Sequence, residues 1–295
     1  MRSRRPEWLR VGTLGSGRAE EVRKLLRRLS LDTVCREAGC PNIGHCFERG
    51  AAAFLVLGDR CTRSCGYCGV KKADTPLPPP DPGEPRRIAE AACVLGLRHV
   101  VITSVTRDDL PDGGAGHFAE VVSAIRASLP GATVELLVPD FRGSAEALSA
   151  IAAARPDILN HNIETVRRLF PSVRPGASYR ASLDLLASFA GMSPGTPLKS
   201  GMMLGMGETR AEVTASMADL RRSGVSLLTL GQYLAPSAHH WPVERYLEPS
   251  EFEELREEAL DAGFSAVASG PLVRSSYHAG DMAGSPDHGS GVPRD

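Results

Sequence analysis

The chain has 295 residues, of which 42% are hydrophobic and 23% are charged, and its formal net charge is −1. This composition is that of a soluble globular protein with room for one large core or two smaller ones. A nucleic-acid-binding protein usually carries a basic excess, which is missing here. No apolar run approaches the roughly 20 residues that span a bilayer, and no apolar signal-peptide core follows the basic N-terminal residues. We therefore expect a cytoplasmic protein with no membrane and no nucleic-acid partner.

The first predicted element is a basic helix over residues 16–29, with Ser16 as its N-cap and aliphatic residues on one face. Two glycines and a proline within the segment 35–49 predict a loop. The basic face of the helix is either simply solvated or attracts an acidic partner, and both interpretations stay open. Its cations are Arg18, Arg23, Lys24, Arg27 and Arg28.

From residue 51 onward, short apolar runs alternate with helix-patterned segments. Six strands that alternate with helices indicate parallel βαβ units, and continuous apolar runs are typical of strands buried on both faces. The spacing fits a full or partial (β/α) barrel and also an open doubly wound sheet. The predicted strands are Ala53–Leu57, Val100–Val105, Val134–Val138, Ile158–His161, Lys199–Leu204 and Leu227–Tyr233. The predicted helices are 84–96, 116–129, 144–154, 178–190, 209–223 and 250–262.

Polar residues crowd the carboxyl ends of these strands, which is where sites form in parallel α/β folds. Each one alone is weak support, because ordinary strand ends are polar too. Their agreement over several strands favours a site at this edge of the sheet. The residues are Thr103 and Ser104, then Asn160, His161 and Asn162, then Gly205, Gly207 and Glu208, and finally Gln232.

Six of the seven cysteines fall within 34 residues, and Cys93 stands alone. Clustered thiols in a cytosolic protein more often ligate metal than form disulfides. Cys93 lies among alanines and aliphatic residues of a predicted helix, and we expect it to be a small buried hydrophobic residue.

The first cysteine set, Cys61, Cys65 and Cys68, has the pattern C-x₃-C-x₂-C directly after the first predicted strand. Three thiolates can hold three irons of a [4Fe–4S] cluster and leave the fourth iron open to a small molecule. Structural zinc, the main alternative, normally has four protein ligands. This spacing on the loop after the first strand resembles the radical SAM superfamily, in which the open iron binds S-adenosylmethionine (SAM). Tyr67, beside the last ligand, is expected near the adenine of SAM.

The second cysteine set, Cys35, Cys40 and Cys46, has the pattern C-x₄-C-x₅-C. Alone this pattern is compatible with zinc, a redox switch or coincidence. Its surrounding residues, Cys-Arg-Glu-Ala-Gly-Cys-Pro-Asn-Ile-Gly-His-Cys, resemble the lipoyl synthase family. The resemblance covers nearly the whole chain. It extends through Pro6–Arg10, Val101–Val105, Arg107–Leu110, Asp112–Gly114, Leu137–Arg142, Asn160–Asn162, Val173–Gly176, Lys199–Gly201, Gly205–Thr209, Leu228–Leu234, Gly270–Pro271 and Arg274–Ala279.

The resemblance implies a partial (β/α)6 barrel of the radical SAM type with two extensions. Residues 1–50 would form the N-terminal extension, 51–235 the barrel and 236–280 the C-terminal extension, and 281–295 would be a disordered tail. In this family, three early cysteines and one serine hold an auxiliary [4Fe–4S] cluster. By position that serine is Ser276, although a serine pair near the C-terminus is otherwise interpreted as a polar turn.

The implied activity is that of a sulfurtransferase. Lipoyl synthases insert two sulfur atoms, at C6 and C8, into an octanoyl chain that is amide-linked to a lysine of a carrier domain. The resemblance implies that two SAM molecules are used and that the auxiliary cluster is consumed as the sulfur donor. Implied partners are octanoylated 2-oxoacid dehydrogenase E2 subunits and glycine cleavage H protein, an electron donor such as ferredoxin or flavodoxin, and an iron–sulfur carrier for cluster repair.

Individual SAM contacts follow from position in the family pattern. Asn160 and Asn162, which we expect on one face of the chain, and Lys199 are candidates for the SAM ribose and carboxylate. Thr103 and Ser104 are candidates for its amino group, although the Gly-Gly-Glu stretch common in radical SAM enzymes is absent here.

Three further segments keep two interpretations each. Glu208 either lies beside the adenine or starts a helix after a tight turn. Arg274 either contacts substrate or braces the Ser276 loop. The segment 239–241 is either a surface loop or part of the substrate channel. Two other classes also compete with this interpretation, namely another radical SAM enzyme of the biotin-synthase or methylthio-transferring kind and a non-enzymatic iron–sulfur electron carrier.

Overall fold

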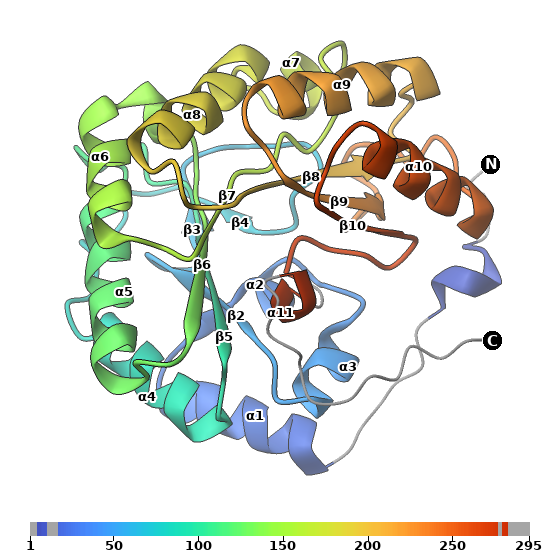
Figure 1. Cartoon of the computed structure of the whole chain (residues 1–295). Coiled ribbons are helices and arrows are strands. Elements are labelled where there is room, and N and C mark those ends of the chain that lie inside the picture. The colour runs from blue at the N-terminus through green and yellow to red at the C-terminus, as the bar shows by residue number, and fades with distance from the viewer. Residues whose placement is uncertain (1–4, 11–16, 277–278, 283–295) are drawn as a thin grey trace.

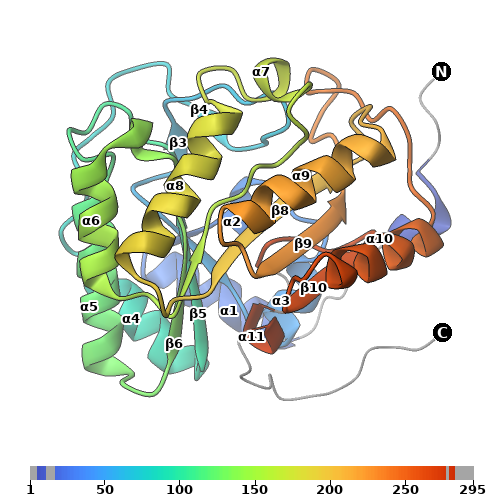
Figure 2. The ribbon, with the colours of Figure 1, turned by 45° about the horizontal axis from the view of Figure 1, so that its top comes forward.

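The computed structural model describes residues 5–10, 17–276 and 279–282. Eight strands form one sheet in the order β1-β2-β5-β6-β7-β8-β9-β10. Neighbouring strands run parallel, apart from β1, which is antiparallel to β2. The sheet curves around a central space and the helices cover its outside (Figures 1 and 2), which confirms the predicted partial barrel. The strands are β1 (Asp32–Thr33), β2 (Ala53–Val56), β5 (His99–Ser104), β6 (Thr133–Leu137), β7 (Ile158–Asn160), β8 (Leu198–Leu204), β9 (Leu227–Gln232) and β10 (Ala266–Gly270), and a separate parallel pair consists of β3 (Arg60–Cys61) and β4 (Lys71–Lys72).

The outer helices begin and end close to the predicted boundaries because local signals fix them. Ser144 and Ser178 accept hydrogen bonds from the third backbone N–H of the helix that each precedes. Thr209 and Glu212 form a reciprocal capping box. These helices are α4 (Glu84–Leu95), α5 (Ala115–Ser128), α6 (Ala145–Ala154), α8 (Tyr179–Met192), α9 (Arg210–Arg222) and α10 (Pro249–Asp261). The shorter or terminal ones are η1 (Glu7–Leu9), α1 (Gly17–Arg28), α2 (Val34–Glu37), α3 (Ile43–Glu48), η2 (Phe141–Gly143), α7 (Phe170–Val173) and α11 (Ala279–Met282).

Two parts of the fold differ from the sequence prediction. The segment 35–49, predicted to be a loop, contains α3 and most of α2, and Thr33 caps α2 by accepting from Arg36 N–H at 3.3 Å. Gly39 and Pro41 lie between the two short helices, and Gly44 lies within α3. A further parallel strand, β10, pairs with β9 and follows α10. Its sequence, Ala-Val-Ala-Ser-Gly, is too weakly apolar to predict a strand.

The two faces of the sheet differ in chemistry. Val100, Ile102, Val134 and Leu136 lie fully buried on the outer face, under the helices. Because successive side chains of a strand point to opposite faces, the alternate residues line the inside of the barrel, and several of them are polar. This inner face, rather than the apolar outer one, provides the positions for chemistry.

The open side of the barrel lies between the β1–β2 edge of the sheet and β10. Helix α11 contacts both β10 and β5 and lies over this side (Figure 1). The predicted disordered tail and the N-cap Ser16 fall outside the described residues, apart from the end of α11. Among the described residues, no helix is long and apolar enough to cross a membrane.

Candidate functional site

The first cysteine set starts at Cys61, the last residue of β3, and continues into the loop that follows, at the carboxyl end of the barrel strands. Gly66, in the middle of this loop, donates its N–H to Val173 O at 2.8 Å and accepts from Trp241 N–H at 2.8 Å. His240 Nε2 lies 3.1 Å from Cys68 O. Helix α7, which follows β7, and the loop that follows β9 therefore brace the cysteine loop from two sides. The segment 239–241, whose role the sequence left open, packs against this loop.

Burial raises the pKa of two thiols of this set, Cys65 and Cys68. It raises the pKa of Cys65, an effect that the charge of Arg174 opposes, and it raises the pKa of Cys68 to about 12. Such thiols are protonated at neutral pH unless a cation stabilises the thiolate. Within the described ranges, no three His, Cys, Asp or Glu side chains are placed to hold a single metal ion. Structural zinc normally has four protein ligands, whereas three thiols suit a [4Fe–4S] cluster whose fourth iron stays open to a small molecule.

A largely buried polar group lies beside this loop. Desolvation raises the pKa of the Glu164 carboxyl, while Arg174 and hydrogen bonds from Asn162 and Tyr67 oppose that shift. The backbone of Glu164 has φ of 66°, a conformation that a non-glycine residue rarely adopts. Arg174 Nη1 donates to Asn162 O at 2.8 Å. Strained residues among buried polar groups are typical of ligand sites.

Two polar atoms of this group have no hydrogen-bond partner, Asn162 Oδ1 and Arg174 Nε. Buried polar atoms are normally paired, so a bound ligand is a natural source of the missing partners. The sequence predicted Tyr67 and Asn162 as site residues but not Glu164 or Arg174. Glu164 follows Asn162 at a spacing of two residues. This continuation of polar residues beyond the strand is the sequence feature that indicates Glu164 as a further site residue.

The inside of the barrel contains a buried polar cluster, in which Asn160 Oδ1 has no hydrogen-bond partner. Lys199 and Glu135 are 0% exposed, and Lys199 Nζ lies 3.0 and 3.1 Å from the two Glu135 carboxylate oxygens. Asn160 Nδ2 donates to Glu135 Oε1 at 2.9 Å, and His99 Nε2 lies 3.4 Å from Oε2. Burial alone would raise the pKa of Glu135, but Lys199, His99 and Asn160 together lower it. A ligand carboxylate could therefore reach Lys199 only by displacing Glu135.

The other predicted SAM contacts point in different directions. Thr103 shares the inner face and donates to Leu137 O at 3.0 Å, whereas Ser104, the next residue of β5, points to the outer face. Both hydroxyls therefore cannot reach one ligand group. Glu208 accepts from the N–H groups of Gly205 and Met206 at 2.6 and 2.9 Å. This carboxylate braces the tight turn after β8, but it does not start a helix, since Thr209 is the N-cap of α9.

Two members of the second cysteine set, Cys35 and Cys46, lie at the opposite, amino-terminal end of the strands, whereas Cys40 is not among the residues that line the cavity there. A cavity of about 390 Å³ is lined by Cys35, Cys46 and Ser276, together with the start of β2 and β5. Burial raises the pKa of Cys46 to about 12, and the neighbouring thiols of Cys35 and Cys40 add to that shift. The fold therefore brings a serine from the end of the chain to the cysteines near its start. The cavity exceeds the volume of one water many times over and can accommodate a cluster.

Arg274 lies in the segment that leads to Ser276. Its Nη1 donates to Val273 O at 2.6 Å, and its charge lies close to Cys40. Burial lowers the pKa of this guanidinium, and the Cys40 thiol opposes that shift. Asn162 Nδ2 donates to Ser275 Oγ at 2.7 Å, which connects the same segment to the polar group beside the first set. The 274–276 segment thus contacts both halves of the candidate site.

Cys93 is exposed, so its prediction as a core residue was wrong. Ala91 and Ala92 take the buried positions of α4, while Cys93 and Val94 fall on its solvent side. The apolar neighbours of Cys93 in sequence therefore did not identify the buried face of the helix.

Comparisons with known proteins identify the family of the chain. Residues 55–220 match the model of the radical SAM superfamily. The chain is 54% identical over 281 residues to a lipoyl synthase of Methylococcus capsulatus, with 95% of this chain and 87% of the relative covered. It is 56% identical over 280 residues to a lipoyl synthase of Trichlorobacter lovleyi, with 95% and 99% covered.

Solved structures support the fold alone, because their sequence identity to the chain is low. Methylornithine synthase PylB has a TM-score of 0.54 at 15% identity, and the match covers 89% of this chain and 84% of that protein. HydG, a maturase of the [FeFe]-hydrogenase, has a TM-score of 0.55 at 14% identity, with 88% and 63% covered. The family model over residues 55–220 and the relatives at more than half identity show that the chain belongs to the radical SAM superfamily and, within it, to the lipoyl synthase family.

Proposed function

We propose that the chain is a sulfurtransferase that inserts two sulfur atoms, at C6 and C8, into a protein-bound octanoyl-lysine to give the lipoyl group. The observation that carries this proposal is the presence of two separate sets of three cysteines, with Ser276 lining the cavity of the second set. An electron carrier would need neither a barrel around the sets nor a set that lacks a fourth protein ligand. The serine distinguishes this proposal from other radical SAM enzymes with an auxiliary cluster.

Each set would hold one [4Fe–4S] cluster. When bound, the first cluster with SAM supplies the one-electron chemistry that removes hydrogen from unactivated carbon, and the auxiliary cluster supplies the sulfur. The protein supplies orientation and exclusion of water. The ligands would be Cys61, Cys65 and Cys68 for the first cluster, and Cys35, Cys40, Cys46 and Ser276 for the second.

The polar group beside the first set is the proposed SAM site. Asn162 Oδ1 has a free acceptor position that suits a ribose hydroxyl, and Glu164 presents a desolvated carboxylate next to it. Tyr67 hydrogen-bonds to the same carboxylate and is partly buried there, as expected for a residue near the adenine. Thr103 lies on the inner face and is the better of the two β5 candidates for the amino group. These roles remain predictions.

The separate roles proposed for the two clusters are tested by anaerobic incubation with SAM, dithionite and an octanoyl-lysyl peptide, followed by mass analysis. We expect replacement of two hydrogens by two sulfurs and release of 5′-deoxyadenosine. Cys61→Ala should abolish both products, whereas Cys46→Ala should keep 5′-deoxyadenosine and lose sulfur insertion. Cys93→Ala is the matched control because this thiol is exposed and outside both sets. Failure of the wild type to release 5′-deoxyadenosine would overturn the proposal.

The serine ligand has a chemical consequence. An alkoxide is a harder ligand than a thiolate and suits cluster iron less well. The iron that Ser276 holds should therefore leave first when the cluster is consumed. Ser276→Cys should keep about eight irons per chain, the content of two four-iron clusters, but slow turnover. Ser265→Cys, at an exposed serine on the surface, is the control, and an unchanged product yield for Ser276→Cys would contradict the idea.

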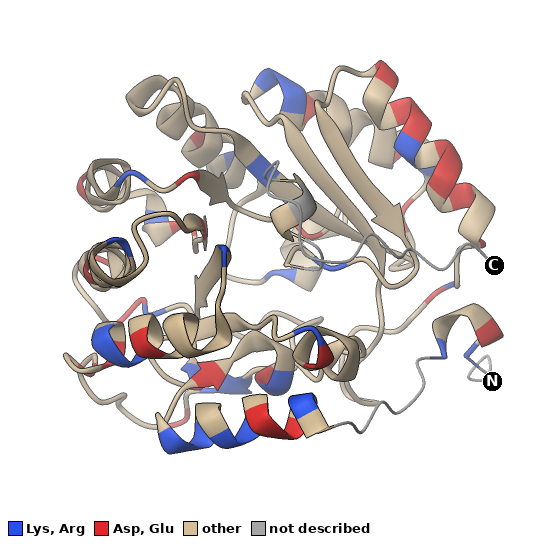
Figure 3. Cartoon of the chain, turned by 60° about the horizontal axis from the view of Figure 1, so that its bottom comes forward, with Lys and Arg blue, Asp and Glu red and all other residues tan. Residues whose placement is uncertain are grey.

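The proposed protein substrate is an octanoylated carrier domain, and α1 is its candidate steering surface. This helix carries five cations and two glutamates, and Figure 3 shows its blue residues along one surface of the molecule. Arg18 of α1 also lines the cavity of the second set, together with Arg49 and Arg98. Such a positive surface accelerates association with an acidic partner.

Salt separates steering from a merely solvated helix face, because screening weakens steering between exposed charges. Product formation from an intact carrier should fall with ionic strength more steeply than product formation from a free octanoyl-lysyl peptide. Lys24→Glu, on the exposed side of α1, should reduce that difference. Equal salt dependence for the two substrates would rule out steering by this surface.

A further inference from the structure

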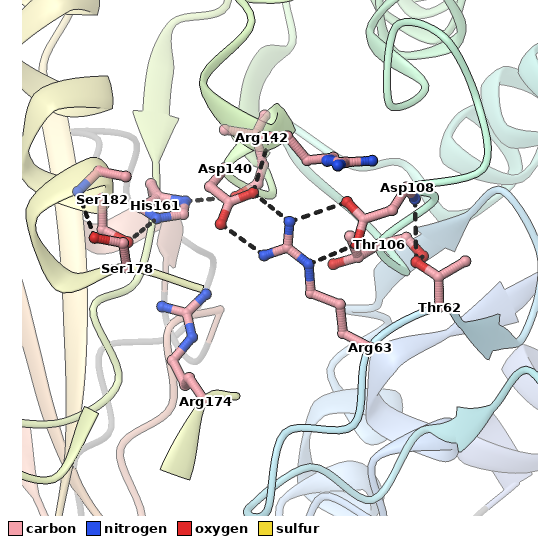
Figure 4. Close-up of polar contacts among 12 residues, drawn as sticks. Thr62, Arg63, Thr106, Asp108, Asp140, Arg142, His161, Arg174, Ser178 and Ser182 are labelled. Carbon is pink, nitrogen blue, oxygen red and sulfur yellow. Dashed lines mark hydrogen bonds and ion pairs between the residues drawn. The ribbon is translucent and has the colours of Figure 1, made fainter. Parts of the chain in front are cut away.

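A buried arginine lies inside the first cysteine set, between Cys61 and Cys65. The Arg63 side chain is 8% exposed and points away from the loop, between two aspartates (Figure 4). Its Nε and Nη2 donate to Asp108 at 2.8 and 3.0 Å, and its Nη1 and Nη2 donate to Asp140 at 2.6 Å each. All of its polar nitrogens thus take part in charge-assisted hydrogen bonds, which are the strong ones.

The two aspartates come from two different strand-end loops. Asp108 lies between β5 and α5, and Asp140 lies between β6 and η2. Asp140 is 5% exposed and also accepts from Arg142 N–H at 3.0 Å, so its own position is fixed. The guanidinium therefore ties the cysteine loop to two neighbouring loops of the barrel. Only an arginine has the planar fork that serves two carboxylates at once.

The β5–α5 loop also contacts Cys61, a proposed cluster ligand. Thr62 accepts from Asp108 N–H at 3.0 Å and donates its hydroxyl to Thr106 O at 2.9 Å. Thr106 N–H in turn donates to Cys61 Sγ at 3.3 Å. The backbone N–H of Arg63 also donates to Cys61 Sγ, at 3.4 Å. One of these two hydrogen bonds to sulfur thus comes from the loop that Arg63 holds through Asp108.

We propose that Arg63 is a positioning residue that sets the reduction potential of the SAM-binding cluster by holding the Thr106 N–H against Cys61 Sγ. Hydrogen bonds to ligand sulfurs stabilise the more negative, reduced state of an iron–sulfur cluster and so raise its potential. This inference rests on the proposed function only in assuming a cluster on the first cysteine set. We call the ion-paired group of Arg63, Asp108 and Asp140 the clamp. The inference gives this clamp a role in electron uptake by the cluster.

For Asp108→Ala, the positioning argument and a simple charge effect predict opposite changes in the reduction potential, so this variant tests the inference. Asp108→Ala removes a negative charge near the cluster, and by charge alone it should raise the potential. By the positioning argument it releases the β5–α5 loop, weakens the bond to Cys61 Sγ and lowers the potential. Arg63→Lys keeps the charge but loses the fork, so positioning predicts a lower potential and charge predicts no change.

The measurement is an anaerobic redox titration of the reconstituted protein, followed by electron paramagnetic resonance. For Arg63→Lys and Asp108→Ala, we expect the reduced-to-oxidised ratio of the SAM-binding cluster at a fixed potential to fall about tenfold, which is a shift of about 59 mV for a one-electron couple. The auxiliary cluster of the same molecule should not shift and serves as the internal reference. Arg168→Lys is the matched control, because Arg168 makes an exposed two-bond contact with Glu212.

Unchanged potentials in both variants, or a raised potential in Asp108→Ala, would overturn the inference. A wild-type protein without a reducible, SAM-responsive cluster would instead overturn the proposed function, so the two failures are distinct. If a variant does not bind its cluster, hydrogen exchange of the cluster-free chain gives a second measurement. Faster exchange at Thr106 N–H in Arg63→Lys than in the wild type supports the clamp, and equal exchange contradicts it.

Discussion

The buried pair of Lys199 and Glu135 gives the sharpest test of how the barrel is built. Both side chains are 0% exposed, and the ammonium contacts both carboxylate oxygens. Lys199→Met leaves the carboxylate with only Asn160 and His99 as partners. Removing one partner of a buried ion pair costs about 3–5 kcal/mol, because the remaining charge stays in a poorly polarisable environment. We expect the free energy of unfolding to fall by that amount.

The loss should come from the unpaired charge and not from the missing amine itself. The double variant Lys199→Met with Glu135→Gln removes the charge and keeps an acceptor oxygen for Asn160. Replacing a buried pair with uncharged groups of similar volume is often close to neutral. The double variant should therefore recover most of the loss that the single variant suffers.

Urea unfolding of the cluster-free chain measures these differences, and removing the clusters from every variant avoids a transition coupled to metal loss. A loss below about 1 kcal/mol for Lys199→Met, or no recovery in the double variant, would refute the electrostatic argument, since exposed pairs contribute that little. SAM titration of the reconstituted double variant separates the two roles of Lys199. A dissociation constant within about twofold of the wild type supports a role in the barrel, and a tenfold weakening, about 1.4 kcal/mol, would show that Nζ reaches SAM.

Three further predictions concern the fold and the second set. Burial, with Arg174 nearby, lowers the pKa of His161 to about 4. Because this value lies below the ordinary 6.5, the folded state loses about 2 kcal/mol of stability as the pH falls from 7 to 5. Thermal unfolding of His161→Gln should lack that part of the pH dependence. Thr209→Ala removes a capping hydroxyl and should cost about 1 kcal/mol in urea unfolding, whereas an unchanged midpoint would show that the box contributes nothing. Gly231→Ala would place a Cβ 2.1 Å from Val273 O, so it should displace the Ser276 segment and lower the iron content from about eight to about four per chain, as iron analysis would reveal.

Much of the fold is encoded locally. The alternation of apolar runs and helical patterns predicted six barrel strands within one or two residues, and capping residues such as Ser144 and Thr209 fixed helix starts. The cysteine spacings and the residues around them were sufficient to predict the family. These features depend on residues close together in the chain, and such signals are legible in one sequence.

Other features depend on the direction of side chains and on distant partners, and they arise only in the folded chain. Strand alternation separates Thr103 from Ser104, and the inner face pairs Lys199 with Glu135, although the two lie 64 residues apart. The same holds for Arg63, whose two aspartates come from separate loops. Only folding brings such charges into a space without water, where each needs a partner and its pKa shifts. Local sequence therefore sets which elements and ligand types are present, and the fold sets which side chains remain available to a ligand.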